Sequence, residues 1–162
     1  MRLLVVLQLL VLLTLANGTP VIAKKILGDR LAWPLDGGLR FVDGRPLLGA
    51  SKTLRGVVLA VLVTGAGAAL IGPGWRIGLL VGALAMAGDL VSSFVKRRLN
   101  RPPSSQAMGL DQIPEALLPL LACRPLLALG LLDIAAVVLV FFAGEIVVSK
   151  LLYRLHIRDR PY

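Results

Sequence analysis

Long apolar stretches most constrain what this chain can fold into, because they alternate with short polar segments. They cover roughly residues 3–23, 57–71, 77–95, 113–125 and 131–152. A helix that crosses the hydrocarbon core of a bilayer needs about 20 mainly apolar residues. Backbone polar groups find no water there, so only helices and closed barrels cross. We therefore expect an all-α, polytopic membrane helix bundle of about five transmembrane helices, forming one domain over residues 1–162.

Composition supports the membrane class and narrows the partners. Hydrophobic residues make up 57% of the chain, and its formal net charge is +9. A basic protein can bind nucleic acid or anionic headgroups. Here the cations lie between apolar stretches, which favours the bilayer and phosphate groups over nucleic acid. Cys123 is the only cysteine, so neither an internal disulfide nor a thiolate metal cluster is expected.

The N-terminal stretch has two interpretations. Residues 3–15, followed by Ala16, Asn17 and Gly18, imitate a signal peptide. The apolar character nevertheless continues to Ala23, which gives about 20 residues, enough to span a bilayer. We expect a retained helix.

The distribution of cations predicts which segments share a side of the membrane. The segment 24–55 and the C-terminal tail are rich in Lys and Arg, whereas the turns on the other side hold only Arg76 and Arg124. By the positive-inside rule, both long loops and the tail should be cytoplasmic and the N-terminus outside. We expect a multi-pass protein of the cell (inner) membrane whose active-site loops are cytoplasmic.

Asp89 is the residue that most strongly indicates function, because it is an acid inside the apolar stretch 77–95. An ionised carboxylate at membrane depth is costly, so it normally faces a polar interior, a partner or a metal. Helical spacing places Ser93 and Lys96 on the same face, at i+4 and i+7. Lys96, Arg97 and Arg98 alone would be explained as interfacial cations. Together with Asp89, this face suits a metal ion that carries phosphates.

Asp111 is the second acid of interest. Taken alone, it is a helix N-cap, the commoner role for such an aspartate. Asp111 and Asp89 both lie near the same predicted membrane boundary. Two carboxylates with nearby cations can hold Mg²⁺ together with the phosphates of a nucleotide.

The first long loop combines glycines with charged residues. Gly37, Gly38, Gly44 and Gly49 permit tight turns and a close approach of backbone N–H groups to an anion. The run at residues 49–53 superficially resembles a P-loop, but the first glycine is misplaced and no strand precedes it, which excludes a Walker motif. A solvated turn is the simpler interpretation of this loop alone.

In combination, these segments resemble a known family, CDP-archaeol synthase, an integral membrane cytidylyltransferase related to the phosphatidate cytidylyltransferases. The motifs that carry the resemblance are Asp43-Gly44-Arg45, Ser51-Lys52-Thr53, Arg55-Gly56, Gly88-Asp89, Ser93-Phe94, Lys96-Arg97-Arg98 and Leu110-Asp111-Gln112. They extend over nearly the whole chain, from Asn17 and Pro20 to the C-terminal Tyr162.

The resemblance implies a reaction and roles for residues. CTP and a membrane lipid phosphate, archaeol-type or phosphatidate-like, would give a CDP-activated lipid and pyrophosphate, with Mg²⁺ as cofactor. Asp89 and Asp111 would bind the metal. The resemblance further implies a catalytic role for Lys96 and for both metal-binding acids. Nucleotide binding would involve Lys52, Arg55, Lys96 and Arg97 on the triphosphate, with Asp36 and Asp43 shaping the nucleotide-binding loop. Glu145 and Ser149 stand where the family has histidine and asparagine, which leaves the identity of the lipid open.

Two other functions fit parts of the sequence. CDP-alcohol phosphotransferases also use membrane aspartates, but their two aspartates three residues apart do not follow Asp36-Gly37 or Asp43-Gly44. A small non-enzymatic transporter or scaffold subunit would use Asp89 as an ion-pathway residue. Stabilisation by CTP would separate a transporter from a cytidylyltransferase.

Overall fold

The computed structural model of the protein describes residues 2–105 and 107–156. Its helices are α1 (Leu3–Leu27), α2 (Leu54–Ile71), α3 (Trp75–Arg98), α4 (Gln112–Leu127) and α5 (Leu131–Arg154). Outside the helices, strand-like pairing within these ranges is limited to two isolated β-bridges in the first loop. They join Pro34 with Thr53 and Arg40 with Pro46. The expected all-α membrane bundle is confirmed.

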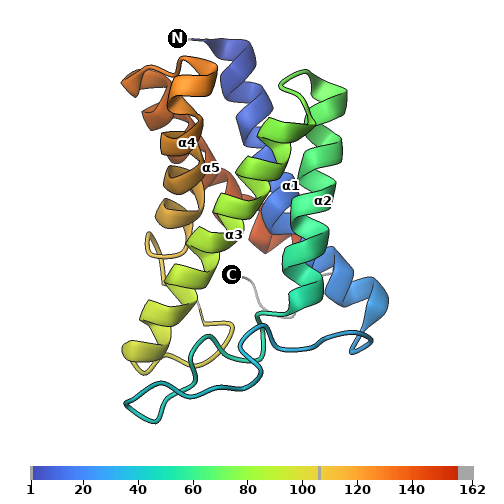
Figure 1. Ribbon diagram of the computed structural model, residues 1–162, viewed down its shortest axis with the longest axis vertical. Coiled ribbons are helices and arrows are strands. Elements are labelled where there is room, and N and C mark those ends of the chain that lie inside the picture. The colour runs from blue at the N-terminus through green and yellow to red at the C-terminus, as the bar shows by residue number, and fades with distance from the viewer. Residues whose placement is uncertain (1, 106, 157–162) are drawn as a thin grey trace.

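The helices alternate in direction, so the two long loops come together at one end of the bundle (Figure 1). At the opposite end the start of α1 is attached to the start of α5. The backbone nitrogen of Arg2 donates to Asp133 Oδ1 at 2.8 Å, and Arg2 Nη1 donates to the carbonyl of Leu127 at 2.8 Å. Helices α1 and α5 therefore run in the same direction, away from this end and toward the loops.

Four of the five helices meet the length and hydropathy that a membrane span requires, namely α1, α2, α3 and α5. Helix α4 has 16 residues and contains Pro119 and Pro125. At 1.5 Å per residue it is about 24 Å long, shorter than the hydrocarbon core. The fourth stretch is thus a short helix that packs on one side of the bundle, mainly against α3 and α5, with Leu118, Leu121 and Leu126 exposed. The other helices extend beyond the predicted spans, α1 to Leu27 and α3 to Arg98.

Small residues allow α3 to approach its neighbours closely, as is usual where helices pack in a membrane. The clearest case is Gly88, next to Asp89. A Cβ at Gly88 would overlap the carbonyl of Pro114 and lie 2.7 Å from the backbone nitrogen of Glu115. Glycine at this position lets α3 touch the backbone of α4, so Asp89 lies against the first turns of α4.

We predict that Gly88→Ala separates α3 from α4, because the obstacle is backbone and cannot rotate away. Overpacking of this kind costs about 1–3 kcal/mol. Thermal unfolding of the purified protein in detergent should show a lowered midpoint. Gly67→Ala is the matched control, since its new Cβ would meet mainly the flexible end of Leu15. Equal stability of the two variants would contradict this account.

Candidate active site

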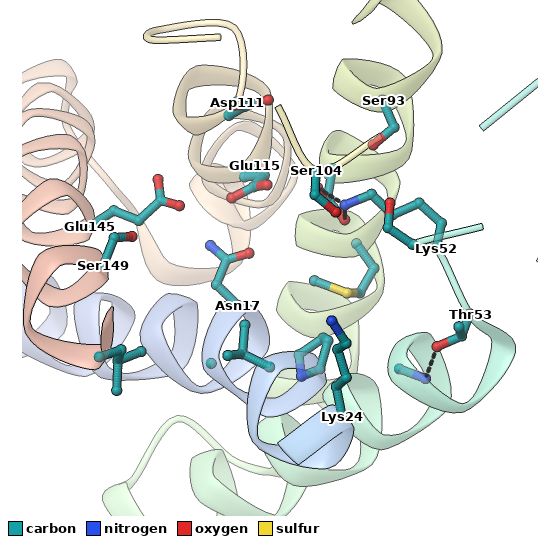
Figure 2. A pocket seen from close by; sticks show the side chains of 18 of the residues that line it. Asn17, Lys24, Lys52, Thr53, Ser93, Ser104, Asp111, Glu115, Glu145 and Ser149 are labelled. Carbon is teal, nitrogen blue, oxygen red and sulfur yellow. Dashed lines mark hydrogen bonds and ion pairs between the residues drawn. The ribbon is translucent and has the colours of Figure 1, made fainter. Parts of the chain in front are cut away.

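A cavity of about 810 Å³ opens at the loop end of the bundle, and all five helices contribute to its lining. Figure 2 shows polar side chains pointing into it from different elements: Asn17 and Lys24 from α1, Ser93 from α3, Glu115 from α4, and Glu145 and Ser149 from α5. Lys52 and Thr53 reach it from the first loop, and Ser104 and Asp111 from the second.

Asp89 forms an ion pair with Lys52 across the cavity. Lys52 Nζ lies 2.6 Å from Asp89 Oδ1 and 2.5 Å from Oδ2. The two side chains are 22% and 19% exposed, so water reaches the pair only partly. Burial by itself would lower the pKa of Lys52, but the Asp89 carboxylate raises it above its ordinary value, with smaller contributions from Glu115 and Asp111. Lys52 therefore stays charged.

Asp111 forms the second ion pair, with Lys96. Lys96 Nζ lies 2.6 Å from Asp111 Oδ1 and donates to the carbonyl of Ser105 at 3.0 Å. Asp111 Oδ2 accepts from the backbone nitrogen of Ala107 at 2.8 Å. Asp111 occupies the N-cap position of α4 but makes no capping hydrogen bond. Its carboxylate instead faces the second loop and the cavity.

The face predicted on α3 is present, since Asp89, Ser93 and Lys96 all line the cavity. Lys96, however, pairs with Asp111, while Asp89 pairs with a lysine 37 positions earlier in the chain. The two acids and two lysines thus form two ion pairs in the lining of one cavity.

Two residues of the cavity lining carry buried polar atoms that have no protein partner among the described residues. Arg97 is 4% exposed and Ser93 is 2% exposed. Arg97 Nη2 donates to the carbonyl of Pro102 at 2.9 Å. Among the described residues, Nε and Nη1 of Arg97 and Oγ of Ser93 have no hydrogen-bond partner. Buried donors of this kind are costly unless satisfied, and phosphate oxygens would satisfy them.

Asp36 organises the first loop and does not line the cavity. Its Oδ2 accepts from the backbone nitrogens of Leu48 at 2.8 Å and Gly49 at 3.1 Å, and its Oδ1 from Gly38 at 3.0 Å. Burial alone would raise the pKa of Asp36, but these hydrogen bonds lower it below its ordinary value. Gly49 has φ of 98°, a conformation that suits glycine.

Asp43 attaches the loop to the end of α3, and it too lies outside the cavity lining. Its carboxylate pairs with the guanidinium of Arg98. The same guanidinium lies 4.8 Å from the ring centre of Phe41 and 5.0 Å from that of Phe94. These contacts fix the loop against α3, which positions Lys52 opposite Asp89. The structure thus gives Asp36 and Asp43 loop-shaping contacts, without direct contact with the cavity.

Arg55 lines the cavity at the start of α2. Its guanidinium donates to the carbonyl of Gly28 at 3.1 Å and to that of Arg30. It therefore connects the end of α1 to the beginning of α2 and contributes charge to the rim.

Glu115 is a cavity residue that the sequence analysis did not identify. It is 4% exposed, and its backbone lies against Gly88, the neighbour of Asp89 on α3. Its Oε2 has no partner among the described residues. An acid within an apolar helix is the signal that identified Asp89, and it would have identified Glu115 as well. Glu145 and Ser149 also line the cavity.

The donor set fits Mg²⁺ in chemistry. Mg²⁺ commonly binds one or two carboxylates and takes its remaining ligands from substrate phosphates and water. Asp89 and Asp111 line the same cavity and both act on the Lys52 ammonium. Within residues 2–105 and 107–156, no three His, Cys, Asp or Glu side chains form a group that could hold a metal by themselves.

The chain is similar in sequence to proteins of one known family. Residues 66–162 match the family described as CarS-like, CDP-archaeol synthase. A CDP-archaeol synthase of Sulfurisphaera tokodaii is 34% identical over 155 residues, which cover 91% of this chain and 89% of that protein. One from Methanopyrus kandleri is 45% identical over 86 residues, which cover 49% of this chain and 50% of that protein.

A solved structure is similar as well. It is described as an intramembrane enzyme for archaeal membrane lipids biosynthesis, and its TM-score is 0.63 at 30% identity. The match covers 84% of this chain and 92% of that one.

We predict that Lys52→Met destabilises the protein by leaving Asp89 without its counter-ion. Breaking a buried pair costs about 3–5 kcal/mol, and partial exposure reduces this to roughly 1–3 kcal/mol here. The double variant Lys52→Met/Asp89→Asn should recover most of the loss, because no unpaired charge remains. Unfolding in detergent gives the free energy of unfolding of the native protein, the two single variants and the double variant, which together form a double-mutant cycle. Lys150→Met, at an exposed position, is the control. Strictly additive losses would show that the pair does not couple.

Proposed function

Because this chain belongs to the CarS-like, CDP-archaeol synthase family, we propose that it is a nucleotidyltransferase that transfers CMP from CTP to a membrane lipid phosphate and releases pyrophosphate. The observation that supports this most directly is the clustering of Asp89, Asp111, Lys52, Lys96 and Arg97 around one cavity at the loop end of the bundle. Charged groups of both signs at this position suit two phosphate substrates and a cation.

The proposed reaction needs no side-chain nucleophile. An oxygen of the lipid phosphate attacks the α-phosphorus of CTP, and the bond from that phosphorus to the oxygen bridging to the β-phosphate breaks. Pyrophosphate leaves with the electron pair of that bond. The main obstacle is the repulsion between two anions. Lys52, Lys96 and Arg97 would offset it by neutralising the charge that moves to the leaving group.

Asp89 and Asp111 would hold Mg²⁺ in this scheme, and the bound ion would add Lewis-acid neutralisation of the phosphates. Lys52 and Lys96 neutralise the same two carboxylates in the structure. With the carboxylates engaged by a cation, both ammonium groups become available to phosphate oxygens. Ser93 and Arg97 also line the cavity, and each carries a buried donor with no hydrogen-bond partner in the part of the chain that the structure describes.

The orientation in the membrane is part of the proposal. The long loops share one end of the bundle, and the positive-inside rule assigns that end to the cytoplasm, where CTP is available. The lipid phosphate would reach the same end from the membrane. The similarities support no transporter or scaffold role.

We predict that Asp89→Asn and Asp111→Asn each abolish incorporation of labelled CMP from CTP into a lipid phosphate. Each amide keeps the shape of the carboxylate but loses the charge that binds a cation. Both variants should still be recovered in the membrane fraction. CTP with Mg²⁺, but not ATP with Mg²⁺, should stabilise the native protein against heat. Full activity in either variant would show that the substituted aspartate is not a metal ligand.

Adjacent serines provide a matched test of the anion site. Ser93 Oγ has no partner among the described residues, whereas Ser92 Oγ lies 2.9 Å from the carbonyl of Gly88 and 2.6 Å from that of Leu110. We predict that Ser93→Ala lowers kcat/KM for CTP about tenfold without loss of stability, the effect of one hydrogen bond to a charged group. Ser92→Ala should instead lower the melting temperature. Loss of stability in Ser93→Ala, or a lowered kcat/KM for CTP in Ser92→Ala alone, would contradict this assignment.

A further inference from the structure

The cavity extends well beyond the charged site, along one face of α1. Leu10, Thr14, Asn17, Val21 and Lys24 all line it, at successive spacings of four and three residues. This is the repeat of a single helix face. From Lys24 to Leu10 the helix rises about 21 Å at 1.5 Å per residue. The cavity therefore reaches from the loop end toward the middle of the α1 span.

Helix α5 forms the facing wall. Val140, Gly144, Val148 and Leu152 line the cavity at intervals of four residues, again a single helix face. They cover about 18 Å of helix. Because α1 and α5 run in the same direction, these faces bound a groove that leads from membrane depth to the cationic rim.

Two glycines keep this groove open. Gly18 on α1 and Gly144 on α5 both line the cavity, and a Cβ at either would meet no atom within 4 Å. Glycines that permit close helix packing have neighbouring atoms where a Cβ would lie. Gly88 is an example, because backbone atoms of α4 occupy that position. Gly18 and Gly144 therefore leave space that no other side chain of the described residues fills within that distance.

The groove has its own cations at the loop end. Lys24, Lys25 and Arg55 line the cavity there. Figure 2 shows the Lys24 side chain pointing up into the cavity from the α1 helix, between Asn17 and Thr53. This group comes from α1 and the start of α2, whereas the site around Asp89 draws its cations from the end of the first loop and from α3. The cavity thus offers two places for an anion.

We propose that the groove between α1 and α5 is the site of the lipid substrate, with its phosphate monoester against Lys24 and a hydrocarbon chain along the walls past Gly18 and Gly144. This inference rests on the proposed function, because it assigns the second substrate of that reaction. CTP has no group that needs an apolar wall at membrane depth. A lipid phosphate combines the two features of the groove, an anionic head and a long apolar chain.

The first test fills the groove. Gly144→Leu places an isobutyl group in open space, so the fold should persist while the hydrocarbon chain is excluded. We expect KM for a long-chain dialkylglycerol phosphate to rise at least tenfold, with KM for CTP unchanged. Ala143→Leu is the matched control, since Ala143 is the exposed neighbour outside the cavity lining. Unchanged lipid KM in Gly144→Leu, or an equal rise in both variants, would overturn the proposal.

The second test removes the headgroup cation. Lys24→Gln should raise KM for the lipid phosphate about tenfold and leave KM for CTP unchanged. Lys150→Gln, an exposed lysine of α5 outside the cavity lining, should change neither. A rise in KM for CTP alone would place Lys24 in the nucleotide site and contradict the assignment.

A binding measurement separates this inference from the proposed function. A dialkylglycerol phosphate with a pyrene-labelled chain is titrated into the purified protein without CTP, and binding is followed by fluorescence. Saturable binding that Gly144→Leu weakens at least tenfold supports the groove even if no CMP transfer is found. Equal binding by the native chain and Gly144→Leu overturns the groove even if CMP transfer is robust.

Discussion

The need to neutralise charges at the edge of the membrane determines how the loop end of this protein is built. An isolated carboxylate or ammonium is costly there, and each of the four central charges has an opposite partner within 2.6 Å. The partners come from different segments. The pair of Lys52 with Asp89 attaches the first loop to α3, and the pair of Lys96 with Asp111 attaches α3 to the start of α4. The same pairs that reduce the cost of burial therefore assemble the site.

This arrangement also connects folding with ligand binding. A lysine that neutralises an aspartate in this structure is held where a phosphate can take over the interaction, provided that a cation takes over the aspartate. On the proposed function, substrates exchange partners within an existing set of charges, and little rearrangement of the backbone is required. Arg97 and Ser93 differ from the lysines, because they line the cavity and carry buried polar atoms with no hydrogen-bond partner among the described residues. Their desolvation is compensated only when an anion is present.

The parts of the site that the sequence predicted are those set by local geometry. Asp89, Ser93 and Lys96 lie on one face because helical periodicity puts them there, and Asp111 lies beside them because α4 begins at the same end. The partner of each acid was beyond prediction, since Lys52 reaches Asp89 only through the path of a long loop. That path depends on the hydrogen bonds of Asp36 and on the contact of Asp43 with Arg98. Glu115 is buried beside Asp89 because glycine at position 88 lets the backbone of α3 touch that of α4.

The charged site around Asp89 and the groove between α1 and α5 use different means of recognition. This explains why the charged site can be predicted from the sequence and the groove cannot. Charged groups at a membrane boundary are rare and specific, so the charged site around Asp89 stands out among apolar residues. The apolar positions of the groove walls are mainly Leu and Val, which occur at any lipid-facing position and carry no distinguishing signal. Selectivity for a chain must then come from shape, and shape in a groove between two helices is set where side chains are missing. Gly18 and Gly144 are such positions, and only the structure separates them from Gly78 and Gly88, whose missing side chains let helices touch.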